Sequence, residues 1–197
     1  MTQPDLHAGP EHAQAVLEGL QYPDEVLEGL ELDGCTIRSC VFSGASLPEA
    51  RFEDCTFEGC DFSNASLPGA RLVGVKFVEC KLVGVDFTPL RPVGIDVAFR
   101  SSILQYAAFC GLFLKGSRFR DCDASFADFT RTDLRNADFS GTDLSGAVFH
   151  ETDLRGARLH EARGLDLDPT HNRIAKAKLN SDAAVRALRR LGAVVED

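Results

Sequence analysis

Residues 45–71 of the chain read ASLPEARFEDCTFEGCDFSNASLPGAR, and the seven residues that open this stretch return almost unchanged twenty positions later. Within the stretch a large apolar residue stands at every fifth position. A period of five fits neither the 3.6-residue period of a helix nor the two-residue period of a strand, so each pentad is predicted to be a short extended piece followed by a corner. Because the stretch repeats after twenty residues, four pentads make one coil.

The period of five runs through most of the chain in two phases. The pentad centres are Leu32, Ile37, Phe42, Leu47, Phe52, Phe57, Phe62, Leu67, Leu72, Phe77, Leu82 and Phe87 in the first phase, and Phe99, Leu104, Phe109, Leu114, Phe119, Ala124, Phe129, Leu134, Phe139, Leu144, Phe149, Leu154 and Leu159 in the second. Coils joined by ladder hydrogen bonds repeat every ~4.8 Å and stack identical side chains. The sequence therefore predicts an all-β solenoid over residues 30–161, with Phe57 on Phe77 and Phe42 on Phe62.

The two phases are separated by a break at residues 88–96. From Phe87 to Phe99 is twelve residues, which is two pentads plus two. Two prolines in the break remove two ladder donors, so this stretch is not another regular edge. It is either a tolerated insertion at a corner or a loop that touches a partner. Its candidate contact residues are Leu90, Arg91, Val93 and Ile95, of which the apolar three equally suit packing back on the solenoid.

The two ends of the chain lack the clear repeat. Residues 1–29 are expected to form an N-terminal arm or cap, and residues 162–197 a tail with a short α-helix that closes the C-terminal end. The candidate dimer-interface residues in this tail are Leu179, Val185, Leu188 and Leu191. Such an apolar cap favours a two-fold homodimer through the C-terminal end, and the alternative is packing on the last coil only.

Composition narrows the function classes. The first twenty residues contain no Lys or Arg and no apolar segment, and no run approaches the ~18 apolar residues of a membrane span. Seven cysteines, an odd number, suggest reduced thiols in a cytoplasmic protein. The formal net charge is −9, with seven acids and no Lys or Arg in residues 1–31. Direct binding of nucleic acid is therefore not expected, whereas a basic protein surface suits the chain as a partner.

Acidic residues just before the pentad centres are the main candidate binding residues. Twenty-residue spacing stacks Asp123 on Asp143 and Asp133 on Asp153, and the two faces are expected to point outward and stay acidic. The stacked carboxylates are either the plain repeat consensus or a charge pattern that a basic partner neutralises. A convex rod offers no desolvated pocket, and inward cysteines act as small hydrophobes. We expect no catalytic residues, no metal and no cofactor, and hence no enzyme.

Two pentads carry a family resemblance. Ala137-Asp138-Phe139-Ser140-Gly141 and Thr142-Asp143-Leu144-Ser145-Gly146 match the consensus of the pentapeptide-repeat family, roughly Ala-Asp/Asn-Leu-x-x. The resemblance covers about residues 30–161 and implies a right-handed quadrilateral β-helix. At twenty residues a coil, about 26 pentads give six to seven coils, or ~30 Å per subunit.

A closer resemblance is to the topoisomerase-protecting branch, which contains the Qnr-type quinolone-resistance, mycobacterial fluoroquinolone-resistance and albicidin-resistance proteins. It rests on residues 51–57, on the two-phase repeat with its irregular joint, and on the Asp168-Pro169-x-x-Asn172 tail with Lys176 and Lys178. This branch implies a dimeric, DNA-mimicking rod that binds DNA gyrase or topoisomerase IV. The alternative is a general scaffold or protein-interaction module with an unrelated partner.

Overall fold

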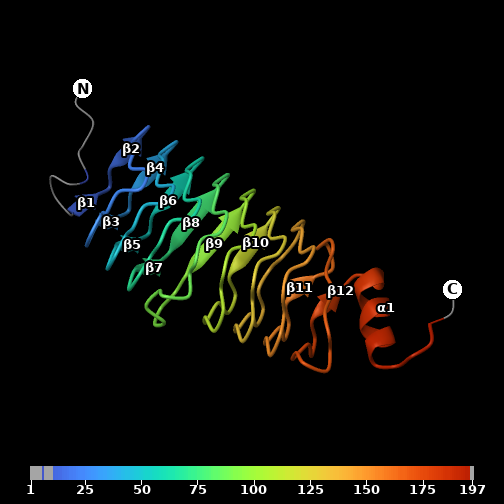
Figure 1. The fold of residues 1–197 in the computed structure, drawn as a ribbon. Coiled ribbons are helices and arrows are strands. Elements are labelled where there is room, and N and C mark those ends of the chain that lie inside the picture. The colour runs from blue at the N-terminus through green and yellow to red at the C-terminus, as the bar shows by residue number, and fades with distance from the viewer. Residues whose placement is uncertain (1–5, 7–10, 196–197) are drawn as a thin grey trace.

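The computed structural model describes residue 6 and residues 11–195, and it forms a parallel β-solenoid of about eight turns with one short C-terminal helix (Figure 1). The solenoid has four sides, as the twenty-residue repeat predicts, and it is right-handed, as the family resemblance implies. Each turn lies directly on the previous one, so the molecule is a rod. The predicted six to seven coils were too few.

Two of the four sides carry strands. Side A contains β1 (Glu11–Ala13), β3 (Glu31–Asp33), β5 (Arg51–Glu53) and β7 (Arg71–Val73). Side B contains β2 (Val16–Glu18), β4 (Thr36–Arg38), β6 (Thr56–Glu58), β8 (Val75–Val78), β9 (Val97–Arg100), β10 (Arg118–Arg120), β11 (Arg158–Leu159) and β12 (Lys178–Leu179). All their pairings are parallel, and the usual register is twenty residues, for example Phe57 opposite Phe77.

On the other two sides, neighbouring coils are joined by single β-bridges rather than by paired strands. Side C runs through the bridged column Asp61, Lys81, Ile103, Asp123, Asp143 and Arg163, and side D through Ser66, Asp86, Ala108, Asp128 and Val148. Along the chain the sides follow in the order A, B, C, D. Each side is short because the pentad turns a corner after two or three extended residues.

Columns of phenylalanine fill the core. Phe42 stacks on Phe62 with ring centroids 4.8 Å apart, and Phe57 stacks on Phe77 at 5.2 Å, which confirms both predicted contacts. Neighbouring columns meet edge to face, as between Phe57 and Phe62 at 5.1 Å and 85°. All four rings are almost fully buried. Stacked and edge-on rings add specific attraction to the burial of apolar area.

The second inward column consists of the residues two positions before each pentad centre. Its side chains are small, and many of them also form hydrogen bonds. At many of its positions a side-chain donor reaches the backbone carbonyl 23 residues earlier, on the preceding coil. These donors are the thiols of Cys55, Cys60 and Cys80, the hydroxyls of Thr132, Thr142 and Thr152, and the amide of Asn172, while the hydroxyl of Ser102 does the same across 25 residues. The cysteines are thus donors as well as small hydrophobes.

The regular ladder extends beyond the predicted limits of 30 and 161. Residues 11–29 form a first coil that pairs with the second, with Leu17 opposite Ile37. Leu17, Tyr22 and Leu27 keep the pentad phase and are buried, but the acidic composition around them obscured it in the sequence. At the other end Leu179 pairs with Leu159 after an irregular turn. The rest of the expected N-terminal arm, residues 1–5 and 7–10, lies outside the described residues.

Helix α1 (Ser181–Arg190) covers the C-terminal end of the rod (Figure 1). Asn180 caps it, because its side chain accepts a hydrogen bond from the Ala183 amide. The buried face consists of Ala183 and Ala187, so the helix lies close to the last coil. Within the described range no helix combines the length and apolarity that a membrane span requires.

Candidate partner-binding surface

The break predicted at residues 88–96 is a projecting loop (Figure 1). Beyond it the register between coils is 22 residues, with Val75 opposite Val97, and it returns to twenty in the next coil. Leu90 is buried and Ile95 packs against the core, so neither is free for a partner. Arg91 forms an ion pair with Glu49 and donates to the Gly69 carbonyl. Val93, at 82% exposure, is the apolar residue at the loop tip.

The two predicted aspartate stacks are present, with Asp123 bridged to Asp143 and Asp133 bridged to Asp153. Each carboxylate accepts a hydrogen bond from the backbone amide two residues later, at 2.9 to 3.2 Å. Aspartate therefore fixes the corner of its own pentad, an Asx-type turn. This local bond gives the repeat its preference for aspartate whether or not a partner is bound.

The Asp133 and Asp153 stack is not an acidic face. Arg135 binds Asp133 and Arg155 binds Asp153, each through two nitrogens with the shortest distance 2.6 Å. The hydrogen bonds from these arginines hold the pKa of both carboxyl groups below its ordinary value. The expectation of an exposed acidic face was wrong here, because the arginine two residues after each aspartate returns to the same side and neutralises it.

Charge is instead divided between opposite sides of the rod. In the coils after the loop, sides A and B with their shared corner carry ten cationic residues against three aspartates. The cationic residues are Arg100, Lys115, Arg118, Arg120, Arg135, Arg155, Arg158, Arg173, Lys176 and Lys178, and the aspartates are Asp133, Asp138 and Asp153. Sides C and D keep Asp123, Asp143 and Asp128 against Arg163. In these coils the rod thus has a basic half, made of sides A and B, and a mildly acidic half, made of sides C and D, although the chain as a whole has a net charge of −9.

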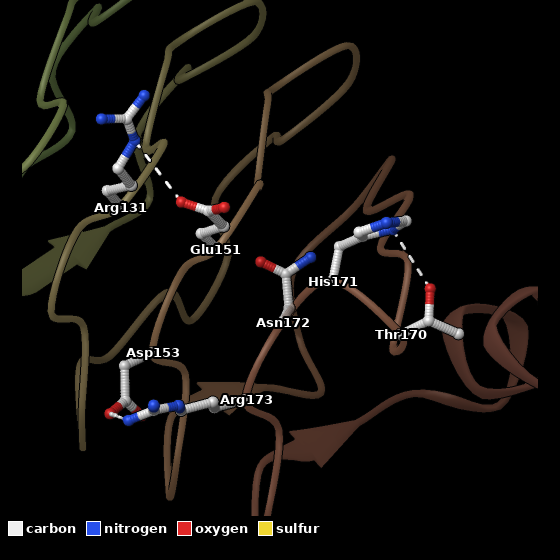
Figure 2. Close-up of a pocket in the computed structure, with 7 residues that line it drawn as sticks. All are labelled: Arg131, Glu151, Asp153, Thr170, His171, Asn172 and Arg173. Atoms are coloured by element: carbon white, nitrogen blue, oxygen red, sulfur yellow. Dashed lines mark hydrogen bonds and ion pairs between the residues drawn. The ribbon is translucent and has the colours of Figure 1, made fainter.

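Figure 2 shows a surface hollow near the C-terminal coils, lined by Arg131, Glu151, Asp153, Thr170, His171, Asn172 and Arg173. His171 Nδ1 lies 3.1 Å from the Thr170 hydroxyl and 3.2 Å from Asp168. A nucleophile relay needs the two partners on opposite ring nitrogens, but both contacts here use Nδ1. Among the described residues no group of three His, Cys, Asp or Glu side chains is placed to hold a metal ion.

Comparison of the sequence with family models agrees with this architecture. The model of a pentapeptide repeat region matches residues 30–109, and the model of eight pentapeptide repeats matches residues 99–136 and 132–163. The chain belongs to the pentapeptide-repeat family. No curated protein matches the sequence of this pentapeptide-repeat protein.

Solved structures of QnrB1, a plasmid-mediated fluoroquinolone resistance protein, resemble this pentapeptide-repeat protein. One trypsin-treated variant is 20% identical, with a TM-score of 0.66 over 93% of this chain and 96% of that chain. A second is 21% identical, with a TM-score of 0.66 over 94% and 99%. Full-length QnrB1 gives a TM-score of 0.52 over 92% and 99%. At identities this low, the structural likeness shows a shared fold and nothing more.

The C-terminal end of this pentapeptide-repeat protein exposes part of the apolar set predicted for a dimer. Leu188 and Leu191 are 46% and 59% exposed, whereas Val185 and Leu179 are half-buried. Both leucines are thus exposed although the helix packs on the last coil through its alanines. Dimerisation through this end stays a prediction.

Proposed function

We propose that this pentapeptide-repeat protein is a non-enzymatic rod that binds DNA gyrase or topoisomerase IV and protects the enzyme from inhibitors such as quinolones or albicidin. The observation that carries the proposal is the match to QnrB1 along almost the whole of both chains, with a TM-score of 0.66. The sequence features shared with the topoisomerase-protecting branch, above all residues 51–57 and the irregular joint, support the same reading.

The physical basis of the proposal is occupation of a DNA-binding surface. About eight coils at a ladder spacing of ~4.8 Å give a rod of roughly 40 Å. A topoisomerase must hold duplex DNA on a cationic surface, because DNA affinity is dominated by phosphate contacts. Sides C and D of the rod, with Asp123, Asp143 and Asp128, are the sides whose charge suits such a surface. The basic sides A and B would then face away from it.

The test is a supercoiling assay with purified gyrase, titrated with the protein in the presence and absence of a quinolone, and in a second series of albicidin. The proposal expects either rescue from the drug or direct inhibition of supercoiling, and it expects direct binding that weakens as ionic strength rises. If gyrase and topoisomerase IV behave identically with and without the protein, the proposal is wrong. A partner pull-down would then address the scaffold alternative.

A further inference from the structure

Two aromatic side chains lie exposed at the corner where sides C and D meet. Tyr106 and Phe126 occupy the same position in consecutive coils, and they are 61% and 53% exposed. Their rings stack face to face with centroids 5.2 Å apart and an interplanar angle of 8°. The phenylalanines of the core are almost completely buried, so this pair is a separate feature of the surface.

The backbone at these two positions is unfavourable for aromatic residues. Tyr106 and Phe126 both have φ of 59°, in the left-handed region that bulky residues rarely adopt. Other coils fill this corner with residues that tolerate positive φ, namely Asp24, Gly44, Asn64, Gly84 and Gly146. Gly146 also leaves room for the ring, since a Cβ there would lie 2.6 Å from Phe126 ring atoms. The aromatic pair is thus held at the expense of local stability.

Carboxylates flank the aromatic pair on both sides. Asp123 lies on side C, and Asp86 and Asp128 lie on side D. In the part of the chain that the structure describes, none of the three has an ion pair within 4.0 Å. Burial alone would raise the pKa of Asp128, but hydrogen bonds from Thr130 outweigh it and hold the pKa below its ordinary value. The rings are therefore bordered by negative charge at neutral pH.

We propose that this aromatic edge, made of Tyr106, Phe126, Asp86, Asp123 and Asp128, is the contact point for an arginine-bearing surface of the topoisomerase; the inference rests on the proposed function. A guanidinium stacks on an aromatic face and pairs with a carboxylate at the same time. Exposed aromatic residues are also the side chains that most often dominate binding energy at protein interfaces. A DNA-binding surface supplies the required cations.

The test exploits the backbone conformation. A Tyr106→Asn/Phe126→Asn double variant places at both corners a residue that tolerates positive φ, as Asn64 does in this same column. We expect its Tm to equal or exceed that of the wild type, while its affinity for gyrase falls at least tenfold. Ser101→Asn is the matched control, because Ser101 is an exposed corner residue of the Tyr106 coil with φ of 50°. It should leave affinity unchanged.

A second pair of substitutions separates charge from stacking. Asp123→Asn/Asp128→Asn keeps an oxygen that accepts the turn hydrogen bonds of Ser125 and Thr130 but removes both charges. We expect weaker gyrase binding and a shallower salt dependence, with no change in Tm beyond a few degrees. Binding is measured by surface plasmon resonance on immobilised gyrase over a series of salt concentrations.

The outcomes distinguish the two proposals. If wild-type protein neither binds nor protects gyrase or topoisomerase IV, the proposed function and the aromatic edge fall together. If the wild type binds and the Tyr106→Asn/Phe126→Asn variant binds equally well, the aromatic edge is wrong and the proposed function stands. A variant that loses affinity only together with a lower Tm or a changed oligomeric state also overturns the inference, since the rings would then stabilise the rod or a contact between its copies.

Discussion

Thr142 illustrates what the second inward column contributes at the scale of one residue. Its side chain is completely buried, and its hydroxyl donates to the Phe119 carbonyl at 2.5 Å while accepting from the Cys122 amide at 3.2 Å. Two backbone groups of the preceding coil thus depend on one hydroxyl. Unpaired polar groups in a core cost far more than a hydrogen bond gains, so the column favours small donors.

Thr142→Val should destabilise the protein, whereas Thr142→Ser should be tolerated. Valine has the shape of threonine but leaves the Phe119 carbonyl without its donor, for a loss of about 1–3 kcal/mol in the free energy of unfolding. Serine keeps the hydroxyl and loses one methyl group. Urea denaturation of the three proteins measures the difference. Equal stability of the valine and serine variants would contradict the role of the hydroxyl.

The surroundings of Asp138 predict that part of the stability of the fold is lost in acid. It is 6% exposed, and burial alone would raise its pKa, but hydrogen bonds from Ser140 and Arg120 outweigh that effect and lower the pKa. A carboxyl group with a depressed pKa in the folded state stabilises the fold above its unfolded pKa of about 3.9, and this contribution is lost as pH falls through the folded value. Asp138→Asn should therefore lose about 1–2 kcal/mol at pH 7 and show a flatter decline in acid.

Thermal unfolding of the wild type and Asp138→Asn between pH 7 and pH 2 measures this effect. Asp143→Asn is the control, because Asp143 accepts the same kind of turn hydrogen bond but has no ion pair within 4.0 Å in the described structure. A wild type and Asp138→Asn that differ by the same amount at every pH would show that the carboxylate charge is not responsible.

At the scale of the elements, the sequence predicts what the period controls and misses what the side chains add. The pentad, the inward columns and the break with its two extra residues follow from spacing alone, and the structure has all three. The first coil was missed because Leu17, Tyr22 and Leu27 keep the phase within an acidic segment. At the candidate site, stacking of Asp133 on Asp153 was predictable, but their pairing with Arg135 and Arg155 depends on side-chain reach that a linear period does not contain.

The two extra residues of the loop between β8 and β9 should be removable. Deleting Pro92 and Gly94 shortens the interval from Phe87 to Phe99 to two pentads and brings Val93 to the inward position that follows Leu72 in its column. We expect the variant to fold with a Tm equal to or above that of the wild type, because the extra residues lie outside the ladder. Circular dichroism and thermal unfolding check this, and the gyrase assay then shows whether the loop contributes to binding.

A matched deletion of Asp133 and Leu134 lies inside a regular pentad and shifts the inward positions that follow it. It should therefore abolish folding, as expected where the register is fixed by burial. If the deletion in the loop is as damaging as this one, the loop is a structural part of the coil rather than an insertion.

At the scale of the whole molecule, the solenoid separates its charges and leaves its ends to be closed. The negative charge gathers on the first coils and on sides C and D, while sides A and B become basic after the loop. Every coil is covered by its neighbours except at the two ends, so solenoids need caps. Helix α1 closes one end through Ala183 and Ala187, while Leu188 and the C-cap residue Leu191 stay exposed.

These exposed leucines predict a dimer. Leu188 and Leu191 lie on one apolar surface beyond the last coil, and an isologous contact between two copies would bury both pairs and roughly double the length of the rod. Analytical ultracentrifugation should give twice the chain mass of 21.4 kDa for the wild type and the single mass for Leu188→Glu/Leu191→Glu. The variant should stay folded, because the alanines that dock the helix are unchanged, and Arg189→Glu on the same helix should remain dimeric. A monomeric wild type at micromolar concentration would refute the interface, and it would require any topoisomerase contact to be made by a single rod.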